Sequence, residues 1–394
     1  MSFKRRKTIL FLGDGMADEG IAELNGLTPL QAVNGAAMNR IAAEGRSGTM
    51  LTLPEGYPTS SDVANMSVLG CDLATEICGR GPLEAASRGI KLGPDDICFR
   101  VNLVTVDPQG IMRDYSGGQV SKDVAEESID LLNAHLGNDE IRFYTGVSYR
   151  NLLVLSGKRF SDAVACEKPD DHHGDVYAGL LPKAKSVAGN ETVAVLHDLI
   201  AKASVLLKGR TANAIWPWSG GRAGAIHNIN KRYGIRAAVI SAVDVINGLG
   251  RCMGMDVINV PGATGYIDTN FEGKADAAIA AINDYDFVYV HVEAIDEVSH
   301  AQNLKLKMQA IRDFDQRLVG RVINALGNSV NYAVLPDHPV PLRCGKHTRT
   351  PVPVSVWRGD WTPDNVKQYN EISCRNGSLG ELKGRELMDL LLGV

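Results

Sequence analysis

The chain has 394 residues, enough for two domains, and its 44% hydrophobic and 22% charged residues are ordinary for a globular protein. The formal net charge of −5 excludes the basic surplus of a nucleic-acid-binding protein, and no apolar run is long enough for a membrane span. The seven cysteines include no C-x-x-C pair and the start lacks the apolar region of a secretory signal, so we expect a reduced, cytoplasmic protein.

The first predicted strand is Thr8–Gly13, a continuous apolar run that ends on Asp14. Apolar runs without alternation are typical of strands that are buried on both faces of a parallel sheet. The residues just beyond the carboxyl ends of such strands form the ligand crevice. Asp14 lies between Gly13 and Gly15, where a backbone without side chains would let a metal ion and a phosphate approach.

Pro58 and the Ser/Thr cluster after it predict the start of a helix, with Val63, Met66 and Leu69 on its apolar side. Ser61 lies at this start, where free N–H groups and the positive end of the helix dipole favour an alkoxide and an incoming phosphate. A metal ion would lower the pKa of the hydroxyl further. Ser61 is therefore the candidate nucleophile, although the ordinary role of a serine here is that of a helix cap.

The middle of the chain has a different pattern, with short β-like stretches, many Gly, Asp and Asn turn signals, and one helical stretch over residues 121–136. We therefore expect an α/β fold of two domains. A mostly parallel sheet flanked by helices is formed by residues 1–78 and 230–394, and a second α/β domain of residues 79–229 is inserted into it.

Three later apolar runs predict further strands of the parallel sheet, and residues 304–326 have the apolar spacing of a helix that packs on it. Asp296 follows the second of these runs, and Asp337 directly follows the third. Carboxylates from distant parts of the chain would thus converge at one edge of the sheet. The three runs are Ile235–Ser241, Phe287–Val292 and Tyr332–Pro336, the last followed by Asp337 and His338.

Two-metal sites for phosphoryl transfer need carboxylates and imidazoles that hold two divalent ions close together. Asp296 and His300 have i, i+4 spacing, so both could bind one ion if the segment makes a helical turn. Asp337 and His338 are adjacent, and they could bind two different ions, or one ion only at a turn. His347 adds another imidazole. Each pattern alone is usually structural, but their joint occurrence at predicted strand ends indicates a metal centre.

In this order, these residues resemble the metal site of the cofactor-independent phosphoglycerate mutases, in the shorter, archaeal-type branch of that family. The resemblance covers nearly the whole chain, and it implies the fold of the alkaline phosphatase superfamily. Further similar segments are Gly79–Ala85, Met112–Gly118, Ser148–Leu152, Asn213–Trp218, Val239–Asp244 and Val260–Tyr266.

The resemblance also implies the site residues. Manganese is the usual metal of the family, with magnesium, zinc or cobalt as alternatives, and 2,3-bisphosphoglycerate is not needed. One ion would be held by Asp14, Ser61, Asp337 and His338, and the other by Asp296, His300 and His347. Arginines of the inserted domain would bind the phosphate and carboxylate of the substrate in bidentate fashion, and the candidates are Arg80, Arg100, Arg150 and Arg222.

The reaction implied by the resemblance begins with attack of Ser61 on the phosphate of 3-phosphoglycerate. The resulting glycerate would turn between the domains and take the phosphate back from the phosphoserine on its 2-hydroxyl. Domain closure would exclude water, which would otherwise hydrolyse the phosphoserine. The expected protein is a monomer that acts on a small phosphorylated substrate.

Some segments depart from the family pattern and leave the acceptor open. Gln119 stands where a histidine is common, and the segments Trp218–Arg222 and Pro169–His173 also differ. An alternative is phosphorylation of homoserine in threonine synthesis. Because the chain has neither type of Gly-rich kinase loop, that activity would use Ser61 and the same metals. A plain phosphatase, another phosphosugar mutase and a non-catalytic binding module are further alternatives.

Overall fold

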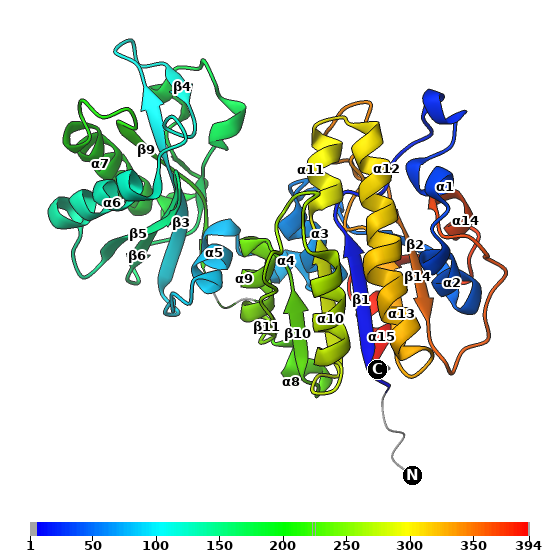
Figure 1. The fold of residues 1–394 in the computed structure, drawn as a ribbon. Helices are drawn as coiled ribbons and strands as arrows, with labels where there is room; N and C mark the ends of the chain where they lie inside the picture. The colour runs from blue at the N-terminus through cyan, green and yellow to red at the C-terminus, as the bar shows by residue number, and fades with distance from the viewer. Residues whose placement is uncertain (1–5, 223, 225, 393–394) are drawn as a thin grey trace. The chain divides into compact units, whose positions relative to one another are not determined.

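The computed structural model describes residues 6–222, 224 and 226–392. The chain divides into two compact units (Figure 1). Unit 1 comprises Met1–Ile77 and His227–Val394, and unit 2 comprises Cys78–Ile226. The divisions expected from the sequence fall after residues 78 and 229.

Unit 1 is built on an eight-stranded sheet with the order β11-β10-β12-β1-β13-β14-β2-β15. In the described part of the chain, β14 is the strand of this sheet that runs against the others. The predicted fold, a mostly parallel sheet flanked by helices, is therefore confirmed. The strands are β1 (Thr8–Gly13), β2 (Arg46–Leu51), β10 (Ala237–Ile240), β11 (Asp256–Val257), β12 (Phe287–Val292), β13 (Asn331–Leu335), β14 (Val352–Trp357) and β15 (Gly380–Lys383).

Helices α10, α12 and α13 pack on one face of this sheet, and in Figure 1 they flank β1. The remaining helices of unit 1 are mostly short. The helices are η1 (Ala22–Leu24), α1 (Pro29–Val33), α2 (Ala36–Glu44), α3 (Ser61–Val68), α4 (Leu73–Glu76), α8 (Ile229–Tyr233), α9 (Asp244–Cys252), α10 (Phe271–Ala281), α11 (Ala294–His300), α12 (Leu304–Asp313), η5 (Phe314–Gly320), α13 (Arg321–Leu326), α14 (Glu371–Cys374) and α15 (Glu386–Leu392).

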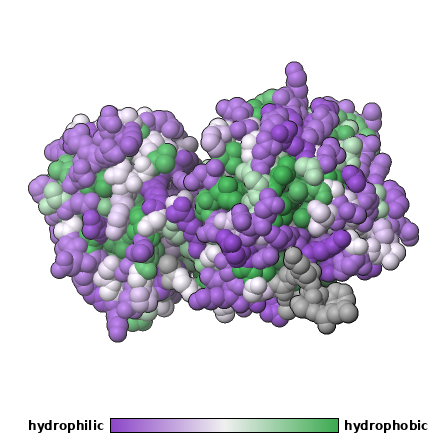
Figure 2. Space-filling model, turned by 60° about the horizontal axis from the view of Figure 1, so that its bottom comes forward, coloured by the Kyte–Doolittle hydropathy of each residue, from purple (hydrophilic) through white to green (hydrophobic). Residues whose placement is uncertain are grey.

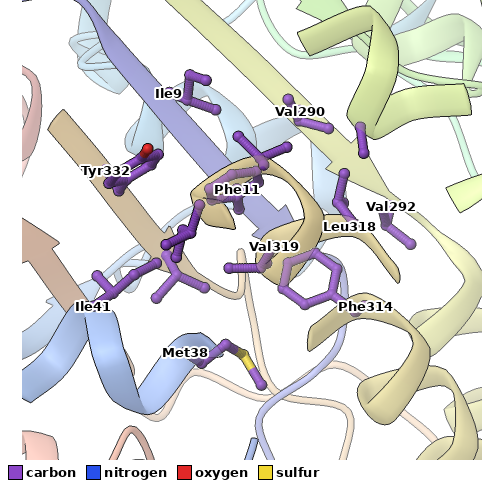
Figure 3. Packing of buried hydrophobic residues seen from close by; sticks show 14 of the residues in the cluster. Ile9, Phe11, Met38, Ile41, Val290, Val292, Phe314, Leu318, Val319 and Tyr332 are labelled. Atoms are coloured by element: carbon purple, nitrogen blue, oxygen red, sulfur yellow. The ribbon is translucent and has the colours of Figure 1, made fainter. Parts of the chain in front are cut away.

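The core of unit 1 lies between the sheet and these helices (Figure 3). Phe11 of β1, Val290 of β12 and Tyr332 of β13 belong to the same cluster as Phe314 and Leu318, and all five side chains are fully buried. Burial of each side chain of this size contributes about 1.5–3 kcal/mol. This packing holds the three central strands as one rigid support.

The carboxyl ends of the three central strands are level. Leu12 of β1 pairs with His291 of β12 on one side and with Leu335 of β13 on the other. The residues that follow these strands therefore emerge at the same edge of the sheet, where α/β proteins bind ligands.

The helix predicted over residues 304–326 is present but changes its pitch. Between α12 and α13, the segment η5 is a π-helix. Within this wider turn, the carboxylate of Asp315 is buried and accepts hydrogen bonds from the backbone N–H groups of Met38 (2.8 Å) and Ala37 (3.4 Å). The residue before α2, Gly35, has no side chain that could cap these N–H groups. Asp315 therefore supplies the acceptor that the start of α2 needs.

Unit 2 contains an antiparallel sheet in which β3 pairs with β4, β6 and β9, and β6 pairs with β5. The helix predicted from residue 121 is confirmed, and Ser121 caps its start. The elements are α5 (Arg80–Ser87), β3 (Asp96–Val106), β4 (Met112–Asp114), α6 (Lys122–Leu136), β5 (Ile141–Val147), β6 (Arg150–Ser156), β7 (Val164–Ala165), η2 (Pro169–Asp171), η3 (Tyr177–Leu180), β8 (Lys183–Ala184), η4 (Val187–Gly189), α7 (Asn190–Leu206) and β9 (Ala214–Arg222).

Hydrophobic residues on the surface in Figure 2 stand among hydrophilic ones. The described residues form no helix with both the length and the apolar character that crossing a bilayer requires.

We predict that Phe314→Ala lowers the free energy of unfolding of unit 1 by about 3–5 kcal/mol, because it leaves a cavity between the sheet and its helices. Urea unfolding followed by circular dichroism measures this loss. The control is Ile372→Ala, whose side chain is 49% exposed, and we expect a change within about 0.5 kcal/mol. Equal effects of the two substitutions would contradict the assignment of the core.

Candidate metal centre

Three side chains of unit 1 converge on the Nε2 atom of His338. Ser61 Oγ lies 3.2 Å from this nitrogen, Asp337 Oδ2 lies at 3.3 Å and Asp14 Oδ1 at 3.4 Å. The side chains of His338, Asp337 and Asp14 are fully buried. Four oxygen and nitrogen ligand atoms are thus gathered around one point, and they come from three distant parts of the chain.

The local backbone explains this convergence. Asp14 directly follows β1, and its N–H donates to Val292 O at the end of β12 (2.9 Å). Gly15 has a φ of +62° and donates its N–H to Asp337 Oδ1 (3.2 Å), which links the segments that follow β1 and β13. A Cβ atom at Gly15 would lie 2.7 Å from Asp296 Oδ1, so both its conformation and its surroundings require glycine.

Ser61 is the first residue of α3, as the sequence predicted, and the residue before it, Ser60, makes no side-chain capping bond. The amide of Asn65, one turn further, donates to Ser61 O (2.8 Å) and to Asp337 Oδ2 (3.0 Å). The hydroxyl of Tyr289 on β12 donates in turn to Asn65 Oδ1. The helix that carries Ser61 is therefore fixed directly to the carboxylate of Asp337.

A second group of ligands adjoins the first. His300 Nε2 lies 3.2 Å from Asp296 Oδ2, and His347 Nε2 lies 3.5 Å from Asp296 Oδ1. The predicted helical turn is present, because Asp296 and His300 both lie on α11. The Nε2 atoms of His300 and His347 are 2.9 Å apart, and the ring of His347 stacks on that of His338 with centroids 3.7 Å apart.

Burial dominates the electrostatics of this centre. It raises the pKa of Asp14, and the nearby carboxylates of Asp337, Glu293 and Asp296 add to that effect. Burial likewise raises the pKa of Asp337 and lowers that of His338. At Asp296, burial opposes ionisation, but His300 and His347 outweigh it and the pKa is lowered.

These residues fit divalent cations. Carboxylates packed together out of water require a compensating positive charge. Asp14 Oδ1 is buried and has no hydrogen-bond donor among the described residues. Carboxylate oxygen and imidazole nitrogen are also the ligand types that manganese, zinc and cobalt accept. Two sets of ligand atoms close enough to share an ion are Asp14, Asp337 and His338, and Asp296, His338 and His347.

Two of the predicted substrate arginines, Arg80 and Arg150, lie close enough to a third, Arg100, for their charges to affect its pKa. Arg100 on β3 is 5% exposed, and its burial lowers its pKa to about 10; Glu84 opposes this shift, and the charges of Arg80 and Arg150 add to it. Its guanidinium lies 4.4 Å from the ring centroid of Trp218, and its Nε is 3.0 Å from Glu84 Oε1.

The fourth predicted arginine is engaged elsewhere. Arg222 is the last residue of β9 and donates a hydrogen bond to Phe160 O. Its partner on β3 is Ile97, whereas Arg100 pairs with Trp218. The structure therefore brings Arg80, Arg100 and Arg150 together and holds Arg222 by a backbone carbonyl.

A model of the metalloenzyme superfamily matches residues 6–393 of the chain. The 2,3-bisphosphoglycerate-independent phosphoglycerate mutase of Methanosarcina acetivorans is 44% identical to this chain, over 98% of the chain and 100% of the relative. The chain belongs to this mutase family and to the metalloenzyme superfamily.

Two solved structures resemble the fold of this family member. The PH0037 protein from Pyrococcus horikoshii superposes with a TM-score of 0.83 at 26% identity, over 99% of this chain and 97% of the other. The cofactor-independent phosphoglycerate mutase from Thermoplasma acidophilum gives a TM-score of 0.70 at 26% identity, over 98% and 99% of the two chains.

Sequence reasoning about this mutase-family chain missed two buried side chains that contact a candidate ligand or the segments next to the candidate metal centre. His291 Nε2 lies 3.0 Å from Asp14 Oδ2, and Lys307 Nζ donates to Asp18 Oδ2 (2.8 Å) and Val340 O (3.0 Å) beside the centre. His291 and Lys307 are both fully buried. A histidine inside the otherwise apolar run Phe287–Val292 was the available signal, because a buried polar side chain in such a strand needs a partner.

We predict a pH-dependent contribution of His300 to the stability of the metal-free protein. Its hydrogen bond with Asp296 raises the pKa of His300 from 6.5 to about 9. Because the folded pKa is the higher one, the protonated pair stabilises the fold fully below pH 6.5, and this stabilisation is lost as the pH rises through about 9. The urea midpoints of the parent and of His300→Gln, measured in chelator, should therefore differ below pH 6.5 and approach each other above about pH 9. A difference that does not change with pH would contradict the pairing.

Proposed function

We propose that this protein is a cytoplasmic phosphoglycerate mutase that interconverts 3-phosphoglycerate and 2-phosphoglycerate without 2,3-bisphosphoglycerate. One observation carries the proposal. Ser61 Oγ, Asp14 and Asp337 converge on His338 Nε2, in a chain that is 44% identical over 98% of its length to a named mutase. The relative of Methanosarcina acetivorans bears that name, and the proposed substrate is a small phosphorylated acid.

We further propose two divalent ions, manganese first among them, and the ligand sets that the contact distances support. When bound, the ions lower the pKa of the attacking hydroxyl and neutralise charge on the phosphate. The first set is Asp14, Ser61, Asp337 and His338, and the second is Asp296, His300 and His347.

Ser61 performs the transfer in this proposal. A bond forms between Ser61 Oγ and phosphorus as the bond between phosphorus and the 3-oxygen of the substrate breaks. The proton that Ser61 loses is balanced by the proton that the 3-oxygen gains, and glycerate remains. The reverse step on the 2-oxygen regenerates Ser61, so the reaction is balanced without a second substrate. The position of Ser61 at the start of α3 supports this role, because the free N–H groups there favour a phosphate.

Arg80, Arg100 and Arg150 provide the positive charge that a carboxylate and a phosphate require. Guanidinium groups bind both anions in bidentate fashion. Glu84 partly balances Arg100, and the ring of Trp218 orients its guanidinium. We propose a smaller role for Arg222, because it donates to Phe160 O.

We predict that Ser61→Ala lowers mutase activity by on the order of a thousandfold or more, because it removes the phosphoryl acceptor. The assay uses manganese-loaded protein and 3-phosphoglycerate, and it couples the formation of 2-phosphoglycerate to enolase. Chelation of the metal should abolish turnover as well. A parallel assay with homoserine and a phosphoryl donor should show no turnover.

The matched control is Ser60→Ala, which removes the neighbouring hydroxyl. Because Ser60 makes no side-chain capping bond, we expect near-parental activity. Near-full activity of metal-loaded Ser61→Ala would refute the nucleophile, and turnover with homoserine alone would move the protein to a different reaction.

We predict that Arg150→Met raises KM for phosphoglycerate about tenfold or more, since a charged hydrogen bond to the substrate is lost. Arg142→Met is the matched control. Both arginines stack on a neighbouring tyrosine, Arg150 at 4.7 Å from the ring centroid of Tyr149 and Arg142 at 5.5 Å from that of Tyr144. Steady-state kinetics with an unchanged KM for Arg150→Met would remove this residue from substrate binding.

A further inference from the structure

A buried histidine connects the metal centre to a serine on the neighbouring strand segment. His291 on β12 is fully buried, and its Nε2 lies 3.0 Å from Asp14 Oδ2. Its other ring nitrogen, Nδ1, lies 3.1 Å from the hydroxyl oxygen of Ser241, which directly follows β10. Both ring nitrogens therefore have a partner, and one of these partners is a proposed metal ligand.

The chemistry of the neighbours determines the direction of each hydrogen bond. Val243 N–H donates to Ser241 Oγ (3.0 Å), because a backbone N–H is always a donor. The carboxylate of Asp14 is an acceptor, so Nε2 of His291 carries the proton. In the neutral ring Nδ1 is then an acceptor, and the hydroxyl of Ser241 donates a hydrogen bond to it. The hydrogen bonds therefore all donate in the same direction, from Val243 through Ser241 and His291 to Asp14.

Among the hydrogen bonds of the described residues, His291 is the donor that holds the Asp14 carboxylate, and it does so through Oδ2. Oδ2 accepts from His291, while Oδ1 has no hydrogen-bond donor among the described residues and lies 3.4 Å from His338 Nε2. Asp337, by contrast, is held by Asn65 and by the backbone N–H of Gly15. The orientation of Asp14 therefore depends mainly on His291. The orientation of Asp337 is shared between two donors, so it depends less on either of them.

We infer that His291 is a positioning residue that turns Asp14 Oδ1 toward the bound metal ion, and that Ser241 sets the tautomer of His291. The inference deepens the proposed function and rests on the metal centre described there. Histidine–carboxylate contacts of this kind orient a ligand without touching the ion. The backbone adds to the constraint, because Lys274 Nζ donates to the carbonyl oxygen of His291 (2.8 Å).

His291 could instead bind an ion directly, since Asp14, His291 and Glu293 together offer ligand atoms close to one another. The hydrogen bonds favour positioning. A metal ion needs a lone pair on Nε2, and this nitrogen carries the proton that Asp14 accepts. Nδ1 uses its lone pair for Ser241. The two roles predict different numbers of bound ions, and the experiment can therefore separate them.

The experiment measures manganese binding by calorimetry to chelator-stripped full-length protein, and counts the ions bound per chain. His291→Leu removes the donor to Asp14, whereas His291→Gln keeps an N–H group in its place. Ser241→Ala leaves the ring intact and removes only the hydroxyl that sets its tautomer. The control is Ser355→Ala, a fully buried serine of β14 in the same sheet, whose Oγ is 2.7 Å from Ser47 Oγ.

We expect His291→Leu to weaken manganese binding about 10- to 100-fold with the parental number of ions per chain. His291→Gln should recover part of this loss, and Ser241→Ala should weaken binding by on the order of fivefold. Ser355→Ala should bind manganese as the parent does. If His291→Leu does not fold, His291→Gln and Ser241→Ala still test the inference.

A fall in the number of bound ions would make His291 a ligand and overturn its role as a positioning residue. Unchanged affinity in His291→Gln, Ser241→Ala and any folded His291→Leu would also overturn it, as would an equal loss in Ser355→Ala. The readout is metal affinity and not turnover. A parent that binds manganese but lacks mutase activity would therefore refute the proposed function while leaving this inference standing.

Discussion

Carboxylates that are buried together repel one another and lose their hydration, so they remain ionised only beside a positive charge. Asp14 and Asp337 are fully buried, and Asp296 is 4% exposed. The level ends of β1, β12 and β13 bring all three to one edge of the sheet. Gly15, beside Asp14, allows the close approach of Asp296, and the hydrophobic core keeps the strands in register.

The side chains on the two faces of β12 contact different parts of unit 1. Val288, Val290 and Val292 belong to the hydrophobic core under the helices. Side chains alternate along a strand, so Tyr289 and His291 point to the opposite face. There, Tyr289 reaches Asp337 through Asn65, and His291 reaches Asp14 directly. A single strand thus supports the core on one side and two carboxylates of the candidate metal centre on the other.

The sequence was sufficient to predict the parallel sheet and the residues at its edge, because both depend on local patterns. Apolar runs that end on a carboxylate revealed β1, β12 and β13, and i, i+4 spacing placed Asp296 and His300 on one helical turn. Whether adjacent Asp337 and His338 serve one ion or two depends on the turn after β13, which no periodicity describes.

The contacts that support the site could not be predicted in this way. The π-helical turn at 314–320 and the bond between Arg222 and Phe160 depend on packing between segments far apart in the chain. The pairing of Asn65 with Asp337 spans 272 positions, and neither residue type indicates its partner. Resemblance to a family indicates candidate ligands, but it does not indicate the hydrogen bonds that orient those side chains.

The alternation along β12 has a consequence for folding. A slip of one residue in its pairing with β1 would exchange the two faces, directing Val290 and Val292 toward the carboxylates and His291 into the hydrophobic core. Such a misregistered chain could not assemble the ligand set, and it would gain nothing from the ions. Metal binding at the proposed ligands would therefore stabilise the correctly paired sheet selectively, so a bound cation would favour the correct strand register.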